Sequence, residues 1–148
     1  VPKKPPTSPS RCLRRYMENM KTKLLSTEGT NLEALIEIEG AEYCVMDELT
    51  LDIETMPKDG ESFEFEFSNI LDEEESWDSI FQGNPEKKKC LEQIKGWKYR
   101  AYGEIISINP VKVDCGVFVE EDVVHTHDPK IVGEFVAFTI RRLGGYTI

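Results

Sequence analysis

The sequence predicts a mainly β domain, a small antiparallel barrel or sandwich of about six strands. Apolar and polar residues alternate along several segments; most clearly, Phe63, Phe65 and Phe67 alternate with acidic residues. Turn residues separate these segments, and helices do not alternate regularly with them as they would in a parallel α/β sheet. One or two short helices are expected between the third and fourth predicted strands.

The first three strands are predicted from this alternation. It begins at Asn31, and the segments 31–39, 45–54 and 63–68 each place apolar side chains on one face and mainly acidic side chains on the other. A turn is expected at residues 57–60, because its proline fixes φ and its glycine accepts a positive φ.

The stretch after the third strand breaks the alternation and predicts helices. Ser76 is a favourable N-cap for a short helix that would bury Trp77. Asn84, followed by proline, fits the start of a second helix that Gly96 would end.

Three further strands are expected at residues 97–108, 111–119 and 131–143, and the pair Gly144-Gly145 is expected to end the last one. Three strands, a helical insert and three strands give an OB-like element order extended by one strand. This similarity concerns element order alone, so it names no function.

Charge is distributed unevenly along the chain. Residues 1–23 hold seven of the 18 basic side chains and one of the 28 acidic ones, which leaves 11 basic and 27 acidic residues and a net charge of −16. We expect residues 1–22 to form a basic, proline-rich tail, either flexible or foreign to the native chain, and residues 23–148 to form one domain. A strongly negative domain repels phosphate backbones and attracts basic surfaces.

The leading functional hypothesis is therefore a non-catalytic acidic module that docks a protein with a basic surface. Self-association through a sheet edge is another version of this hypothesis, and a membrane partner is not expected. The candidate partner-binding residues are the acidic side chains of the third strand and of the following loop: Glu64, Glu66, Asp72, Glu73, Glu74, Glu75 and Asp78.

A metal site is the first alternative. His125 and His127 are spaced to point the same way on an extended segment, and Asp128 follows them. Imidazole nitrogen and carboxylate oxygen are zinc ligands, so a metal-binding protein or metal-dependent enzyme is possible, although the favoured expectation is no cofactor.

A single-stranded nucleic-acid site is the second alternative. Lys98, Arg100 and Tyr102 would share one face of a strand, with Lys112 on the next strand. Basic and aromatic side chains on one sheet face are typical of such sites, but the negative charge of the domain argues against this partner.

Enzymatic activity is not indicated by any of the familiar catalytic motifs. Cys115 lies in register with four valines, which predicts a core thiol and not a nucleophile. Scattered cysteines without a CxxC pair are typical of reduced thiols, so a cytoplasmic location is expected.

Overall fold

The structure is a computed structural model, and it describes residues 21–49, 57–58 and 60–147. Within these residues ten strands form one sheet that is not closed. The predicted fold class, mainly β, is thus confirmed. The last seven residues of the predicted second strand, 48–54, are not assigned to a strand where they are described, and residues 50–54 lie outside the described part.

The first part of the chain forms four antiparallel strands in the order β4-β1-β2-β3. On β2 the core-facing positions are Ala34, Ile36 and Ile38, which follow the alternation seen in the sequence. The four strands are β1 (Thr22–Thr27), β2 (Glu33–Ile38), β3 (Ala41–Asp47) and β4 (Ser62–Phe63).

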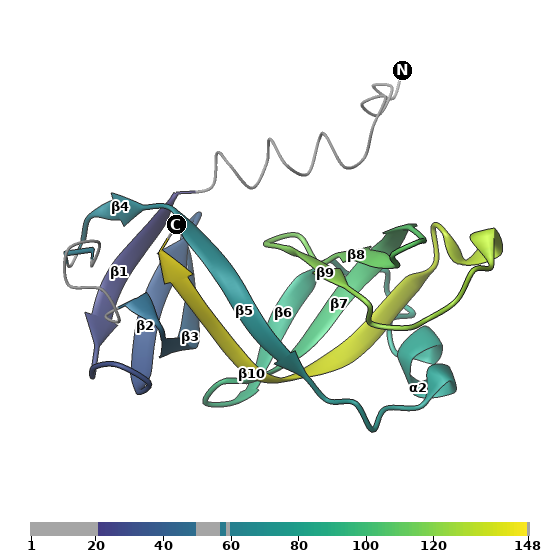
Figure 1. Cartoon of the computed structure of the whole chain (residues 1–148), viewed down its shortest axis with the longest axis horizontal. Helices are drawn as coiled ribbons and strands as arrows, with labels where there is room; N and C mark the ends of the chain where they lie inside the picture. The colour runs from purple at the N-terminus through teal and green to yellow at the C-terminus, as the bar shows by residue number, and fades with distance from the viewer. Residues whose placement is uncertain (1–20, 50–56, 59, 148) are drawn as a thin grey trace, which may run out of the picture.

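The rest of the chain adds six strands and two short helices. Figure 1 shows β1 to β4 grouped on one side and β6 to β9 on the other, with β5 and β10 running between the groups. The elements are β5 (Phe65–Leu71), α2 (Trp77–Gln82), β6 (Cys90–Lys95), β7 (Lys98–Ser107), β8 (Lys112–Asp114), β9 (Val119–Glu121), the 3₁₀ helix η2 (Pro129–Ile131) and β10 (Phe135–Thr147).

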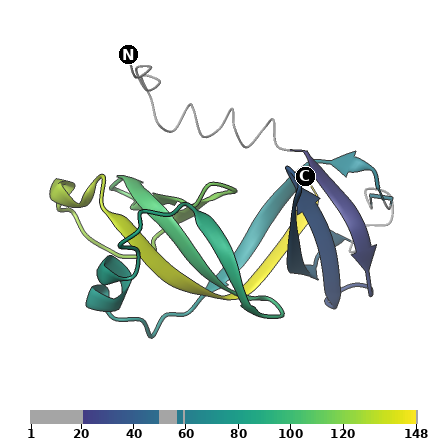
Figure 2. The same ribbon diagram turned by 180° about the vertical axis from the view of Figure 1, so that it is seen from behind.

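Strand β10 joins the two groups of strands. Its first half pairs antiparallel with β7, and its second half pairs antiparallel with β5 and parallel with β3. The view from behind shows the same arrangement, with α2 beside β10 (Figure 2). One long strand is therefore shared by both groups and fixes the position of β5 relative to β7.

The glycine pair in β10 was expected to end the strand, and this prediction is wrong. Gly144 and Gly145 are buried, pair with both β3 and β5, and the strand continues to Thr147. A Cβ atom on Gly145 would lie 1.9 Å from Cζ of Phe65, which is far inside van der Waals contact. Glycine is required here by the close approach of an aromatic ring.

The helical insert differs from the prediction in three ways. The predicted short helix is present as α2, and Ser76 caps it by accepting a hydrogen bond from the backbone N–H of Ser79 at 3.2 Å. However, Trp77 is 45% exposed, and it stacks on Phe81 instead of entering the core. The second predicted helix is wrong, because residues 90–95 form β6 against β7. Extra strands also place α2 after the fifth strand and not after the third.

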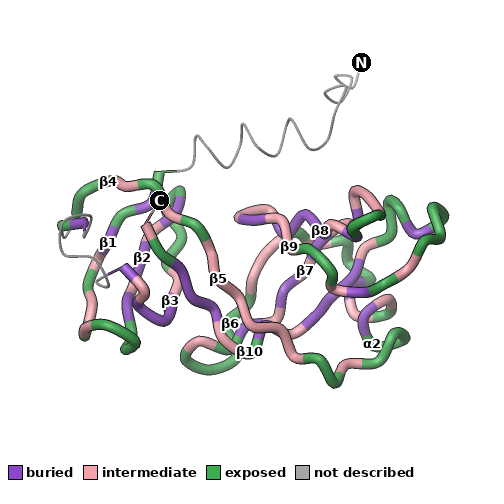
Figure 3. Tube along the Cα trace, in the orientation of Figure 1, coloured by how far each residue is buried: buried purple, intermediate pink, exposed green. Residues whose placement is uncertain are grey.

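A single apolar core extends through both groups of strands, and Figure 3 shows the buried residues concentrated along β2, β3, β7 and β10. Cys115 is fully buried in this core, as predicted, and burial raises the pKa of its thiol well above the ordinary value. The phenol of Tyr99 on β7 accepts a hydrogen bond of 2.7 Å from the backbone N–H of Cys44 on β3. The groups are thus connected by a specific polar contact as well as by apolar packing. None of the helices in the described residues has the length and apolar character needed to span a bilayer.

Candidate functional site: an acidic groove between β5 and β9

An open groove of about 720 Å³ lies between the end of β5 and the segment that begins at β9. Five carboxylates and one histidine line it. No lysine or arginine is part of the lining. We call this site the acidic groove. Its polar lining consists of Asn69, Asp72, Glu73, Glu120, Glu121, Asp122 and His125, and its apolar lining consists of Ile70, Leu71, Ile80, Val123 and Phe138.

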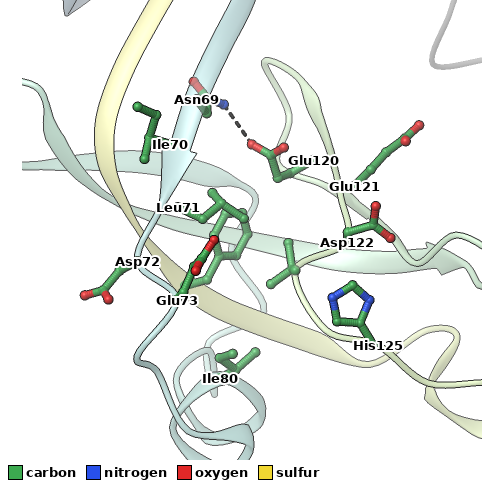
Figure 4. A pocket seen from close by; sticks show the side chains of 12 residues that line it. Asn69, Ile70, Leu71, Asp72, Glu73, Ile80, Glu120, Glu121, Asp122 and His125 are labelled. Carbon is green, nitrogen blue, oxygen red and sulfur yellow. Dashed lines mark hydrogen bonds between the residues drawn. The ribbon is translucent and has the colours of Figure 1, made fainter.

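One wall of the acidic groove is formed where β5 ends. The backbone N–H of Asp72 donates a hydrogen bond of 3.0 Å to the carbonyl of Thr139, which continues the pairing with β10 for one more residue. The side chain of Asp72 then accepts a hydrogen bond of 3.1 Å from the backbone N–H of Glu74 and turns the chain away from the sheet. Asp72 and Glu73 both belong to this wall, and in Figure 4 Glu73 lies nearer the centre of the groove while the carboxylate of Asp72 points away from the opposite wall.

The opposite wall carries three consecutive carboxylates, Glu120, Glu121 and Asp122 (Figure 4). Asp122 has a positive φ of 58°, and its backbone N–H donates a hydrogen bond of 2.9 Å to the carbonyl of Val111. Aspartate tolerates this left-handed conformation better than most residues. Glu120 points toward β5, whereas Glu121 points away from it in Figure 4 and its Oε1 lies 3.8 Å from Nζ of Lys112.

Glu120 and Asp72 are half-buried, whereas Glu73, Glu121 and Asp122 are exposed. Burial raises the pKa of this carboxyl above its ordinary value of 4.5, and hydrogen bonds from Asn69 and from the backbone of Glu121 oppose that rise. Within the described part of the chain, no lysine, arginine or histidine nitrogen lies within ion-pair distance of Glu120. An anion that is partly removed from water without a cation is unfavourable, and a cationic ligand would relieve it.

Asn69 holds Glu120 in place. Its Nδ2 donates a hydrogen bond of 2.9 Å to Oε1 of Glu120, which connects β5 to β9 across the groove (Figure 4). The other polar atom of the same amide, Oδ1, is buried and has no hydrogen-bond partner. Leaving a buried acceptor unpaired costs about 1–3 kcal/mol. The hydrogen bond from Nδ2 therefore fixes the orientation of Glu120.

The apolar lining of the groove suits long side chains with a charged end. Ile80 and Phe138 are buried, and Leu71 and Val123 are partly buried and pack on the core. The methylene stems of lysine and arginine bury well against such surfaces while the charged group reaches a carboxylate. The groove can therefore bind a basic side chain through both of its parts.

Two of the seven predicted acidic residues line the groove, and the other five do not. Asp72 and Glu73 line the groove, and Glu74 is exposed beside them. Glu75 turns inward, forms an ion pair of 2.6 Å with Arg100 and accepts a hydrogen bond from the backbone N–H of Thr139. The remaining three do not line the groove: Glu64 and Glu66 are exposed next to Phe65 at the start of β5, and Asp78 is exposed in the first turn of α2.

The predicted basic and aromatic face is largely engaged within the fold. Arg100 donates to Thr139 at 2.9 Å as well as to Glu75. Lys112 lies 3.8 Å from Glu121, and the ring of Tyr102 lies 4.8 Å from the ammonium of Lys88. Lys98 is exposed. A nucleic-acid strand on this face would have to compete with Glu75 for Arg100.

The two histidines and the aspartate that follows them have separate surroundings. His125 lines the acidic groove, whereas Nδ1 of His127 lies 2.6 Å from Oδ1 of Asn109. Asp128 caps η2 by accepting a hydrogen bond of 2.9 Å from the backbone N–H of Lys130. In the residues that the structure describes, no group of three or more His, Cys, Asp or Glu side chains is arranged to hold a metal ion.

Sequence reasoning missed Asn69 and Glu120 as site residues. Glu120 follows the outward-facing positions of a predicted strand, and Asn69 lies between a strand and an acidic run, so neither has a local signal of its own. Their pairing depends on residues 51 positions apart and is visible only in the fold. Comparison of the chain with protein-family models, with curated proteins and with solved structures gave no match.

Proposed function

We propose that this domain is a non-catalytic interaction module that docks a basic segment of a partner protein in the acidic groove. The observation that carries the proposal is Glu120, a partly buried carboxylate held by Asn69 and without a cation in the described part of the chain. Four more carboxylates belong to the lining of the groove, together with apolar side chains. A lysine or arginine side chain matches this combination of charge and apolar surface.

The strand pairings among β1 to β5 and β10 support an OB-like lobe as part of this proposal. β3 pairs parallel with the end of β10, β10 pairs with β5, and β4 pairs with β1. Glu64 separates β4 from β5 and leaves the ring open. The acidic groove lies at the other end of β5, so the proposed function depends on the groove and not on the fold type.

A cytoplasmic location also belongs to the proposal. The three cysteines in the described residues, Cys44, Cys90 and Cys115, are free thiols. Unpaired thiols are typical of proteins in a reducing compartment.

A titration with a labelled basic peptide tests the proposed function. The peptide consists of repeated Arg-Gly units, and the control peptide has citrulline, which has nearly the same shape and no charge, at every arginine. We expect the arginine peptide to bind at low salt and to weaken about tenfold or more at physiological salt, because exposed charges on the groove rim are then screened. Equal binding of both peptides, or no binding of the arginine peptide at low salt, would refute the proposal.

A further inference from the structure

We infer that a basic patch beside the turn between β6 and β7 binds a phosphorylated side chain of a partner protein. The basic patch consists of Lys95 on β6, Lys98 on β7, and Arg141 and Arg142 on β10. None of these residues lines the acidic groove. The patch is therefore a second surface, and its role does not depend on the proposed function.

Strand pairing brings the four cations of the basic patch together. Lys95 lies directly opposite Lys98 in the hairpin of β6 and β7. The residues that flank the two arginines are bound to the residues that flank Lys98: Ile140 pairs with Tyr99, and the backbone N–H of Leu143 donates a hydrogen bond of 2.8 Å to the carbonyl of Trp97. Figure 1 and Figure 2 both show the turn between β6 and β7 beside the bend in β10. Neighbouring strands are about 4.8 Å apart, so three of them present all four cations within roughly 10 Å of backbone.

A β-bulge places both arginines of the basic patch on the outer face of the sheet. The register of β10 against β5 shifts between Ile140 and Arg142, so Arg141 is an extra residue in this strand. Ile140 and Leu143 are buried in the core, whereas Arg141 is exposed and Arg142 is half-buried between them. The two lysines are exposed as well. The patch is therefore open to a ligand from the solvent side.

The fold supplies no counter-charge to the basic patch. Its three strands contain two carboxylates, Glu92 and Glu104, which pair at 3.1 Å with Lys88 and Lys89, respectively. In the part of the chain that the structure describes, no carboxylate lies within ion-pair distance of a patch side chain. Like charges that face each other across two strands, as the two lysines do, are destabilising. An anionic ligand would remove this repulsion.

Arg142 has an unused donor. Its Nε is buried and has no hydrogen-bond partner among the described residues. A guanidinium presents five N–H donors in a planar fork that matches the geometry of phosphate. An anion that draws this group outward would supply the missing acceptor, and a buried donor without an acceptor is unfavourable. The unpaired Nε of Arg142 thus favours an occupied patch over an empty one.

A phosphomonoester matches the size of the basic patch better than other anions do. It carries a charge of about −1.5 to −2 and three acceptor oxygens on one group, and arginine clusters recognise it in many proteins. Carboxylates on one face of an extended peptide are about 7 Å apart, so less negative charge would reach a patch of this width. A nucleic-acid strand would extend beyond the patch, and the net charge of −10 would repel its remaining phosphates. A single phosphorylated side chain therefore concentrates the most charge where the four cations meet.

NMR titration of the full chain tests the inference. The ligand is the blocked peptide Gly-Ser-Gly with a phosphate on its serine, and the control ligand is the same peptide without the phosphate. We expect saturable shifts in the backbone amide signals of Lys98, Arg141 and Leu143 with the phosphorylated peptide and none with the control. Equal shifts with both peptides, or no saturable shift with the phosphorylated one, would overturn the inference.

Two variants of the basic patch measure its contribution to binding. The variant R141Q/R142Q should bind the phosphorylated peptide at least about tenfold more weakly, because hydrogen bonds from charged donors are lost. The variant K95Q/K98Q should bind it about threefold more weakly. Both of its substitutions lie at exposed positions, so it keeps the test decisive if the half-buried Arg142 is required for folding. Unchanged affinity in K95Q/K98Q would contradict the assignment.

A matched control removes two positive charges outside the basic patch. Lys23 on β1 and Lys130 in η2 are exposed. The variant K23Q/K130Q has the same net charge as either patch variant, and it should change the affinity for the phosphorylated peptide less than about twofold. Equal weakening in K23Q/K130Q and K95Q/K98Q would attribute the effect to net charge and overturn the inference.

Two further ligands distinguish phosphate from other anions. The peptide Gly-Glu-Gly carries one carboxylate, and we expect it to bind at least about threefold more weakly than the phosphorylated peptide. A thymidylate trinucleotide tests a single-stranded nucleic acid of similar length, and we expect it to bind no more tightly than the phosphorylated peptide. Equal or tighter binding of Gly-Glu-Gly would assign the patch to an acidic segment, and tighter binding of the trinucleotide would assign it to nucleic acid. Either result would overturn the inference.

Discussion

The side-chain amide of Asn69 donates a hydrogen bond of 2.9 Å to Glu120, and this contact joins the two walls of the acidic groove. The two residues lie on β5 and β9, which are not neighbours in the sheet. The same amide leaves its Oδ1 buried and unpaired. The contact thus holds a half-buried carboxylate at the edge of the groove.

The Asn69 contact predicts the effect of the isosteric variant Asn69→Asp. Two carboxylates then face each other, and the pKa of the pair rises in the folded state. Groups whose pKa is raised by folding favour the folded state at low pH, and this stabilisation is lost as pH increases. We expect the variant to be about 1–3 kcal/mol less stable than the unmodified chain near neutral pH and close to it near pH 4, in urea unfolding followed by circular dichroism.

The exposed residue Gln82 supplies the control, since Gln82→Glu adds the same charge at the end of α2. Its effect on stability should stay within about 0.5 kcal/mol. A loss of stability in Asn69→Asp that is the same at both pH values would show that the contact with Glu120 is not electrostatic.

The raised pKa of Glu120 predicts the pH dependence of peptide binding. Only the ionised carboxylate attracts a cation, and burial moves its protonation to a pH above the ordinary value of 4.5. Affinity for the Arg-Gly peptide should therefore begin to fall, on acidification, at a higher pH than exposed glutamates alone would cause. Fluorescence anisotropy titrations from neutral to acidic pH measure this. A profile that is unchanged in Glu120→Gln would contradict the role of Glu120.

The ion pair between Arg100 and Glu75 predicts a structural role for both residues. Their nitrogen and oxygen atoms are 2.6 Å apart, and the two side chains are 23% and 12% exposed. Replacing Arg100 by methionine leaves Glu75 partly buried without its cation, so we expect a loss of about 3 kcal/mol in the free energy of unfolding. Lys98→Met, at an exposed position on the same strand, should change it by less than about 0.5 kcal/mol. Chemical denaturation of both variants measures the difference, and equal stability would show that the ion pair is dispensable.

The alternation of apolar and polar residues predicted much of the sheet. The predicted strands at 31–39, 97–108 and 131–143 correspond to β2, β7 and β10, because one face of each strand is buried in the core. The stretch 84–96 was misread because Asn84 and the following proline fit a helix start. Asn84 does accept a hydrogen bond of 2.8 Å from the backbone N–H of Lys88, but pairing of residues 90–95 with β7 outweighs the local preference.

The site was predicted in part, for a physical reason. Asp72 and Glu73 belong to an acidic run that stands out in the sequence, and they line the groove. Glu75 belongs to the same run but pairs with Arg100, which is 25 positions away. The register of distant strands decides which residue of a charged run faces the groove. That register cannot be predicted from the local sequence.

The contact between Gly145 and Phe65 predicts a severe effect of Gly145→Ala. The added methyl group would lie 1.9 Å from the ring, where β10 pairs with both β3 and β5. We expect a loss of about 1–3 kcal/mol or more in stability, measured by thermal unfolding. At Gly40, which has a φ of +85° and no atom near an added Cβ, alanine should cost only about 1 kcal/mol. A smaller loss at Gly145 than at Gly40 would contradict the strand arrangement.

The most direct test of the account is calorimetric titration of the Arg-Gly peptide into three chains: the unmodified domain, Glu120→Gln and Glu42→Gln. Glu42 is exposed on β3 and does not line the groove, so both variants remove one negative charge and differ in its position. We predict that Glu120→Gln weakens binding at least about tenfold, as expected for a buried charged hydrogen bond, and that Glu42→Gln changes it less than about twofold. Equal weakening in the two variants would show that the peptide responds to overall charge, and it would contradict the acidic groove as the binding site.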